Sequence, residues 1–273
     1  MLAQASSGDK NRALASCARL PTLPLQVAAW LCEDGLSASP KTGVLFMERG
    51  GGLAWVSRLG VVMPHLRTED GLRSLARWLG PDRGRVIIGP ADATRALWRH
   101  IERRGARARI IRDQIAYVTT RERFRGHEAS QEIALRPAGQ ADLDIVVDAS
   151  AAMALEESKD DPARRNPGLF RSRISDRIRL ERDFILVEEG RLVFKITVAA
   201  CCPLGGYLEG VYTIPSARGR GLGRAGTAWA TRWILERAPT ATLLVNTDNH
   251  AARRMYENLG FVRAYDSQTI LVR

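Results

Sequence analysis

The sequence predicts an α/β protein in which two copies of one fold, each a mixed sheet with helices on its faces, follow one another along the chain. Segments with strand-like and helix-like patterns alternate throughout the 273 residues. A glycine-rich turn, residues 218–223, joins a strand to a helix in the second half. In the first half, Pro64-x-x-Arg67 precedes a helix just as Pro215-x-x-Arg218 does later. This internal similarity favours a tandem repeat.

The first half reads as a series of short strands and helices. Residues 1–20 are polar and weakly patterned, which predicts a frayed tail or a short helix. Apolar spacing and turn residues then predict, in order, a helix at 25–31, a strand at 44–47, a hairpin turn at 50–52, a strand at 53–63, a helix at 70–79, a strand at 86–88, a helix at 91–104 and a strand at 110–119. The polar, aperiodic stretch 121–131 predicts a linker. We therefore expect domains at 1–126 and 127–273.

The second half follows the same logic with longer strands. The patterns predict, in order, a strand at 133–136, a helix at 141–155, a charged loop, a helix at 170–180, strands at 184–188, 192–200 and 206–214, a helix at 223–237, a strand at 242–245, a short helix after Asn249 and a final pair of short strands from Phe261 to Val272. Asn249 is a good N-cap, and Gly260 is a typical stop for the helix that it begins.

The glycine-rich turn has the composition of an anion site. The first turn of a helix leaves four backbone N–H groups unbonded and carries a partial positive charge. Glycines let a ligand approach that backbone, and Arg218, Arg220 and Arg224 add full charges, so the turn suits a phosphate group. Gly221-x-Gly223-x-x-Gly226 also matches a dinucleotide-binding fingerprint, but only 47 residues follow it, too few for the further βα units of such a domain.

A second motif follows at a fixed distance: Asn249-x-x-Ala252-x-x-x-Tyr256-x-x-x-Gly260-Phe261. Together with Pro-x-x-Arg-x-x-Gly-x-Gly in the turn, it resembles the GNAT superfamily of N-acetyltransferases. The resemblance extends from about Glu132 to the end of the chain and implies two tandem GNAT-like folds, the C-terminal one complete and the N-terminal one degenerate. It also implies an opening between the strand residues 209–214 and 243–246.

The resemblance implies that acetyl-CoA is the cosubstrate. No metal is expected, because the cysteines and histidines do not have the spacing of metal ligands. The residues that the resemblance places around the coenzyme are Tyr212, Thr213, Ile214, Arg218, Gly219, Arg220, Gly221, Leu222, Gly223, Arg224, Asn246, Asn249, Ala252 and Tyr256. Backbone N–H groups around 212–214 are expected to face the thioester oxygen.

Tyr256 and Glu209 are the candidate catalytic residues. Tyr256 matches the family tyrosine that protonates the leaving thiolate, and its alternative is a core aromatic. Glu209 lies where some GNAT enzymes carry a glutamate that acts as general base, and its alternatives are an exposed strand residue or a base that works through water. Glu156, Glu157, Asp160 and Asp161 are expected to form an acidic loop that either attracts a cationic amine acceptor or is simply solvated.

The first half lacks the glycine turn and the tyrosine. Thr68-Glu69-Asp70 stands where a pyrophosphate loop needs Gly and Arg, and two carboxylates there would repel phosphate. Trp98 takes the place of the tyrosine and has no phenolic proton to give. We expect a GNAT-like fold with an empty coenzyme site, which resembles, more loosely, an uncharacterised domain that precedes GNAT domains in some bacterial proteins.

Composition bounds the alternatives. Residues 1–127 hold 21 Lys and Arg against 11 Asp and Glu, which leaves nucleic-acid binding through the first half as a less favoured function. A non-catalytic sensor or partner-binding module for acyl-CoA is the other alternative. Four cysteines, no long apolar run and no signal peptide predict a reduced, cytoplasmic protein without a membrane segment. The resemblance to the GNAT superfamily implies that the acceptor is a small-molecule or peptide amine.

Overall fold

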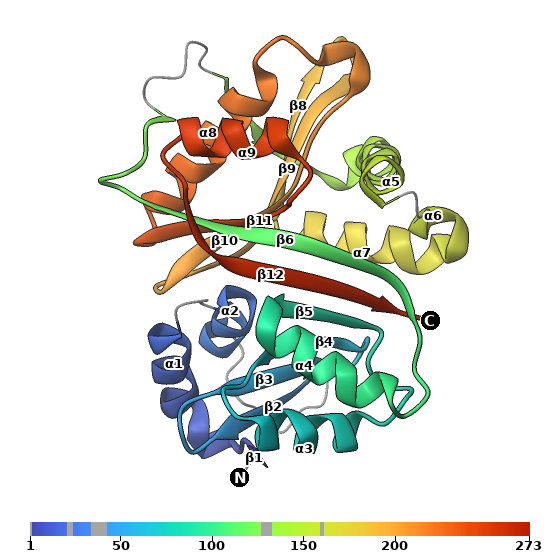
Figure 1. The fold of residues 1–273 in the computed structure, drawn as a ribbon. Coiled ribbons are helices and arrows are strands. Elements are labelled where there is room, and N and C mark those ends of the chain that lie inside the picture. The colour runs from blue at the N-terminus through green and yellow to red at the C-terminus, as the bar shows by residue number, and fades with distance from the viewer. Residues whose placement is uncertain (1, 21–23, 34–42, 127–132, 159–160) are drawn as a thin grey trace. The chain divides into compact units, whose positions relative to one another are not determined.

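The computed structural model describes residues 2–20, 24–33, 43–126, 133–158 and 161–273. The chain forms two compact units that interleave along the sequence (Figure 1). Unit 1 comprises Met1–Tyr117, Leu244–Arg253 and Arg263–Arg273, and unit 2 comprises Val118–Leu243 and Arg254–Val262. The C-terminal strand thus groups with the N-terminal half of the chain. Whether 1–126 and 127–273 are the two copies of a repeat stays a prediction.

Unit 1 is built on a sheet with the strand order β1-β2-β3-β4-β5-β12-β6. The strands are β1 Leu2–Gln4, β2 Gly43–Glu48, β3 Leu53–Ser57, β4 Val61–His65, β5 Val86–Pro90, β6 Ala108–Thr120 and β12 Val262–Val272. Neighbours from β1 to β4 are antiparallel, whereas β4 and β5 run parallel. The connection between these parallel strands is α3, as parallel pairs require.

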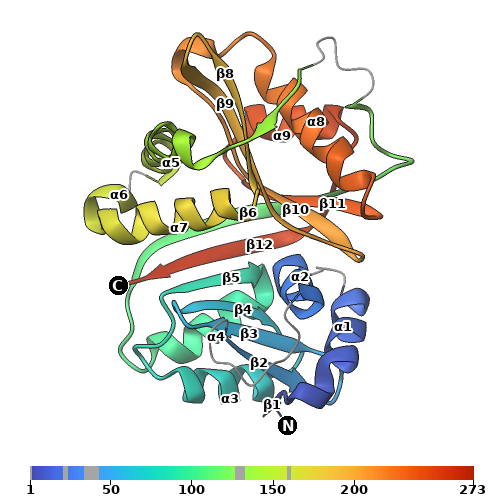
Figure 2. The same ribbon diagram turned by 180° about the vertical axis from the view of Figure 1, so that it is seen from behind.

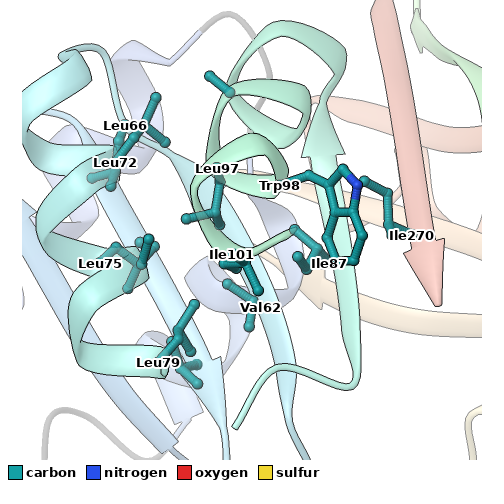
Figure 3. Close-up of a cluster of buried hydrophobic side chains, with 14 of the residues drawn as sticks. Val62, Leu66, Leu72, Leu75, Leu79, Ile87, Leu97, Trp98, Ile101 and Ile270 are labelled. Atoms are coloured by element: carbon teal, nitrogen blue, oxygen red, sulfur yellow. The ribbon is translucent and has the colours of Figure 1, made fainter. Parts of the chain in front are cut away.

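Helices cover both faces of this sheet. They are α1 Lys10–Arg19, α2 Leu25–Glu33, α3 Glu69–Leu79 and α4 Ala91–Glu102, with a short 3₁₀ turn η1 at Ser7–Asp9. α3 and α4 lie against one face, and α1 and α2 lie against the other (Figures 1 and 2). In α3, Leu72, Leu75 and Leu79 repeat every three or four residues, so all three point to the sheet and are buried. Figure 3 shows them packed with Leu97 and Ile101 of α4.

The last strand completes this core. β12 pairs antiparallel with β5, with Thr269 opposite Ile88. Ile270 is fully buried and lies beside Trp98 of α4 (Figure 3). The expectation of two short strands after Phe261 is therefore wrong: β12 is one strand of 11 residues. The apolar pattern did not predict one continuous strand because the middle of β12 is polar. Ser267 there is buried, and its hydroxyl donates to the Gly89 carbonyl at 2.9 Å.

Unit 2 has the strand order β11-β10-β9-β8-β7. The strands are β7 Arg136–Pro137, β8 Asp183–Glu188, β9 Arg191–Cys202, β10 Gly205–Thr213 and β11 Thr240–Asn246, the last of which runs on into unit 1. β10 pairs with β11 in parallel and with β9 antiparallel. The other neighbours are antiparallel.

The helices of unit 2 again lie on two faces (Figures 1 and 2). They are α5 Leu143–Ser158, α6 Pro162–Arg165, α7 Pro167–Arg179, α8 Leu222–Leu235 and α9 His250–Asn258, whose first four residues belong to unit 1, with 3₁₀ turns η3 Gln140–Asp142 and η4 Pro215–Ala217. α5 and α7 pack on one face through Val146, Ile174 and Ile178. α8 packs on the other face, where a Cβ at Gly226 would come within 2.2 Å of the Phe194 ring. Gly226 therefore allows α8 to lie close to β9.

The remaining differences from the sequence prediction have local causes. Gly60, with φ of +80°, turns the chain and splits the predicted strand 53–63 into β3 and β4. The predicted strand 133–136 is reduced to the two residues of β7. Of the frayed tail or short helix expected at 1–20, the helix is present as α1, and β1 before it pairs with β2. Part of the predicted linker, 127–131, lies outside the described residues.

Candidate functional site

The glycine turn between β10 and α8 has the backbone shape that its sequence predicts. Gly219 and Gly221 have φ of +78° and +77°, a left-handed conformation that glycine adopts without strain. Gly221 is the N-cap of α8, and its carbonyl accepts the first helical bond, from Ala225 at 3.0 Å. The amides of Leu222 and Gly223 follow in the first turn, where N–H groups have no partner within the helix. This helix end is therefore available to an anion.

Arg218 is held by an acid from another element. Its Nη2 lies 2.6 Å from Glu156 Oε2, near the end of α5, and its Nε donates to the Thr213 carbonyl at 3.1 Å. Tyr212 donates its hydroxyl to the other oxygen of Glu156 at 2.9 Å. Burial alone would raise the pKa of Glu156, but the bonds from Arg218 and Tyr212 outweigh it and lower the pKa. Glu156 thus stays ionised and ties α5 to the turn.

The two other arginines of the turn differ from each other. Arg220 makes a bidentate pair with Glu188 at the end of β8, with distances of 2.9 and 2.8 Å, and this pair lowers the pKa of Glu188. Arg224 lies in the first turn of α8. Its Nε is buried and has no hydrogen-bond partner among the described residues. A buried donor without a partner is unfavourable, so Arg224 is the arginine best prepared for a further acceptor.

A β-bulge shapes β10 next to the turn. Glu209 faces Thr197 and Tyr212 faces Lys195, so three steps along β10 match two along β9. The extra residue is accommodated at Gly210, whose φ is +60°. Lys195 donates its Nζ to the Gly210 carbonyl at 3.1 Å. Bulges re-aim side chains and backbone groups, and they are frequent beside functional sites.

The backbone amides at the end of the bulged strand β10 point in different directions. The amide of Ile214 donates to the Val193 carbonyl at 3.2 Å. Ile214 is thus not free to face a ligand oxygen through its N–H group, which corrects the prediction at that position. Because successive N–H groups of a strand point to opposite sides, the amide of Thr213 points away from β9. The predicted opening toward 243–246 stays a prediction, since most of its second wall belongs to unit 1.

Glu209 lies at the edge of a buried cluster of charges. Asp183 is 1% exposed and accepts from Arg177 Nε at 3.0 Å and from the hydroxyl of Thr197. Burial lowers the pKa of Lys195 to about 8, against the opposing charge of Asp183. Glu209 is half-buried, and burial raises its pKa although Arg177 and Lys195 work in the opposite direction. A carboxylate with a raised pKa is a stronger base near neutral pH than an ordinary glutamate.

Tyr256 is buried on the face of α9 that the spacing predicts. It is 5% exposed, and its ring meets that of Phe261 edge-on with centroids 5.9 Å apart. Burial raises the pKa of its phenol, and the negative charge of Glu157 adds to the effect. Tyr256 therefore keeps its proton at neutral pH. Its role as an acid and its alternative role as a core aromatic both remain compatible with this position.

Two residues of the predicted acidic loop are helical instead. Glu156 and Glu157 belong to the last turn of α5, and Asp161 is the N-cap of α6, where it accepts from the Arg164 amide at 3.0 Å. Asp160 lies outside the described residues.

The other predicted coenzyme residues have structural partners in unit 1. Asn249 accepts from the Ala252 amide at 3.1 Å and so caps α9 as predicted. Asn246 accepts from Gln114 at 3.2 Å. Their contact with a coenzyme stays a prediction.

In unit 1 the start of α3 follows Pro64-x-x-Arg67, the counterpart in sequence of Pro215-x-x-Arg218, and the carboxylate of Glu48 hydrogen-bonds to it. Glu48, at the end of β2, is 6% exposed. It accepts from the amides of Arg67 and Thr68 at 3.0 and 3.3 Å and from the Thr68 hydroxyl at 2.6 Å. A Cβ at Gly71, in the first turn of α3, would lie 1.9 Å from Glu48 Oε1. An internal carboxylate thus occupies the place of an anion at this helix end.

Sequence reasoning missed Glu48 and Lys195. Nothing in the sequence around Glu48 marks its side chain as a partner of residues 67 and 68. Lys195 did leave a signal, because it is a single charge inside the otherwise apolar run of β9. Within the described ranges, no three His, Cys, Asp or Glu side chains gather as a metal ion would need, and the helices there are too short or too polar to cross a membrane.

Three comparisons with known proteins bear on this fold. The family model described as FR47-like protein, a GNAT-related family, matches residues 195–270. No curated protein matches the sequence significantly. Solved structures match over nearly the whole chain. A tandem GNAT protein of the clavulanic acid biosynthesis pathway has 14% identity and a TM-score of 0.58, with 100% of this chain and 98% of that chain covered.

Two further structures are similar over the same length. A GNAT-family acetyltransferase from Colwellia psychrerythraea has 13% identity and a TM-score of 0.55, and both chains are covered completely. A Drosophila protein has 15% identity and a TM-score of 0.68, with 99% of this chain and 98% of that chain covered. Residues 195–270 thus match a GNAT-related family model, and the chain has a tandem GNAT-like α/β fold. At these identities the likeness concerns the fold, which is one that acetyltransferases use.

Proposed function

We propose that this protein transfers an acetyl group from acetyl-CoA to an amine acceptor. The observation that carries the proposal is the start of α8, where a left-handed glycine turn opens a helix directly after the bulged strand β10. A helix end of this kind binds phosphate through its amides. The bulged strand that leads into this turn carries Glu209, whose pKa is raised by burial.

The residues of the turn fit the pyrophosphate of the coenzyme. The amides of Leu222 and Gly223 supply donors, and the buried Nε of Arg224 lacks a partner among the described residues. Arg218 and Arg220 add positive charge, but each is paired with a glutamate, so both would exchange or share their partners when phosphate binds. When bound, acetyl-CoA supplies an acetyl group activated as a thioester.

In the proposed reaction the acceptor nitrogen bonds to the acetyl carbon while the carbon–sulfur bond breaks. Glu209 takes the proton that the nitrogen loses, and Tyr256 gives a proton to the departing sulfur. The amide of Thr213 is the donor on β10 that could stabilise negative charge on the carbonyl oxygen. The raised pKa of Glu209 increases its basicity, and the raised pKa of Tyr256 means that its phenol carries the proton to be given.

The acceptor is proposed as a cationic amine of a small molecule or peptide. Glu157 carries negative charge close enough to Tyr256 to raise the pKa of the phenol. Such a carboxylate would attract an ammonium group toward the acid that completes the reaction.

A screen for acetyl transfer tests the proposal. The full-length protein would be incubated with acetyl-CoA and panels of polyamines, amino acids, aminoglycosides and peptides, and the release of free thiol would be followed. We expect release that depends on both the protein and one acceptor class, with the acetylated amine identified by mass spectrometry. Coenzyme binding without turnover on any acceptor would instead favour a sensor of acyl-CoA.

A further inference from the structure

Unit 1 contains a cavity that the proposed reaction does not use. Its volume is about 610 Å³, within the range of about 300 to 1,000 Å³ that small-molecule sites usually have. Its walls come from β1, α1, the end of β2, the hairpin turn at Gly50 and Gly51 and the connection between β4 and α3.

The walls of this cavity are strongly basic. Four arginines line it: Arg12, Arg19, Arg49 and Arg67. No ion pair with any described residue is formed by Arg19, Arg49 or Arg67. Arg12 has an exposed pair with Asp9 at 3.0 Å, and such surface pairs are weak. Guanidinium groups match phosphate and carboxylate oxygens with two parallel hydrogen bonds, so four of them around one cavity favour a ligand with several negative charges.

The single carboxylate in the wall does not neutralise these arginines. Glu48 is buried, and its two oxygens already accept from the amides of Arg67 and Thr68 and from the Thr68 hydroxyl. The Glu48 carboxylate is therefore bound to the backbone and hydroxyl donors at the start of α3. The same contacts keep a phosphate away from that helix end, so a ligand of the cavity would bind through arginine side chains.

A buried hydroxyl supplies the second, independent observation. Ser16 of α1 lines the cavity and is 1% exposed. Its Oγ has no hydrogen-bond partner among the described residues. A buried hydroxyl without a partner is unfavourable, and an oxygen of a ligand in the cavity would relieve it. A Cβ at Gly51 would be 3.9 Å from this Oγ, so the hairpin turn that lines the cavity lies next to the Ser16 hydroxyl.

From the cavity, its arginines and Ser16 together, we propose that unit 1 binds a small polyanion, a phosphate ester or a polycarboxylate, at a site separate from the start of α8. The proposal stands on unit 1 alone and does not depend on acetyl transfer.

Calorimetry on the full-length protein with inorganic pyrophosphate and with citrate tests it. Because pyrophosphate also resembles part of CoA, each titration would be run with and without saturating CoA. We expect one pyrophosphate or citrate per chain to bind in the presence of CoA. The double variant Arg49→Gln/Arg67→Gln should weaken the binding of these anions about tenfold or more, because it removes two charge-assisted hydrogen-bond donors. Ser16→Ala should weaken it by a smaller factor.

Arg73→Gln/Arg77→Gln is the matched control. Both residues lie on α3, are exposed and do not line the cavity, so the double change lowers the net charge by the same two units without touching the site. Binding of neither anion, or binding that the double variant leaves unchanged, would overturn the proposal. So would tight binding of a single-stranded oligonucleotide that grows with its length while pyrophosphate and citrate fail to bind. Melting curves would confirm that each variant is folded.

Discussion

Three arginines share the start of α8, but their surroundings give them different roles. Arg218 and Arg220 are paired with Glu156 and Glu188, whereas the Nε of Arg224 is buried without a partner in the described parts of the chain. The sequence predicted all three as phosphate ligands because only their charge and spacing were visible. The partners of Arg218 and Arg220 lie on α5 and β8, more than 30 residues away in the chain, so no local sequence pattern predicts them.

Replacing Tyr256 by Phe tests the proposed acid. The change removes a hydroxyl and little volume, so coenzyme affinity should hold while turnover falls by about 10² to 10⁴, the usual contribution of general acid catalysis. Tyr265→Phe is the matched control, because burial also raises the pKa of Tyr265, to about 12, and no role is predicted for it. Steady-state kinetics of both variants with the acceptor found in the screen would decide. Equal rates for the two would assign Tyr256 to the core alone.

The pH dependence of turnover tests Glu209. Only the ionised carboxylate accepts a proton, and burial raises its pKa above the ordinary glutamate value. Turnover should therefore fall as the pH is lowered through this raised pKa, earlier than an exposed glutamate would cause. Glu209→Gln should be slow and should lose this acid limb of the kcat profile. A variant that keeps both the limb and the rate would point to a different base, such as a water held by another group.

At the level of elements, the sequence predicted most helices and strands because their apolar spacing is regular. α3 and α4 carry their buried residues where the spacing places them, and so does α9 at Tyr256. In α8 the spacing predicted Trp229 and Trp233 on the buried face, but both are only partly buried. The errors occurred where burial is achieved through polar groups or a turn, as in β12 and at Gly60. The bulge in β10 was not predicted either, because a glycine within a strand indicates an irregularity without specifying its register.

Gly226→Ala tests the close packing of α8 on β9. An exposed glycine in a helix is usually less stable than alanine, but here the new Cβ would meet Phe194 at 2.2 Å. We expect the free energy of unfolding to fall by about 1 to 3 kcal/mol, as overpacked cores show. Gly168→Ala in α7 is the control, since nothing lies within 4 Å of its Cβ, and it should be neutral or slightly stabilising. Denaturant titrations would measure both. A Gly226→Ala protein as stable as wild type would refute this packing.

For the whole molecule, the sequence predicted the tandem GNAT-like fold but not how the chain is divided between its compact units. The motifs lie in order along the second half, so the fold could be inferred from them. The exchange of β12 into unit 1 could not, because strand pairing depends on partners such as β5 that are distant in the chain. The prediction of an empty coenzyme site in the first half gains support from Glu48, which lies at the helix end where an anion would bind.

The most direct test of the account is a calorimetric titration of the full-length protein with CoA. We predict one CoA per chain, bound at the start of α8, so Arg224→Gln should weaken binding severalfold or more. Arg232→Gln, which removes the same charge farther along that helix, should leave it unchanged. Two CoA sites per chain, no binding at all, or binding that is indifferent to Arg224 would contradict the proposed coenzyme site.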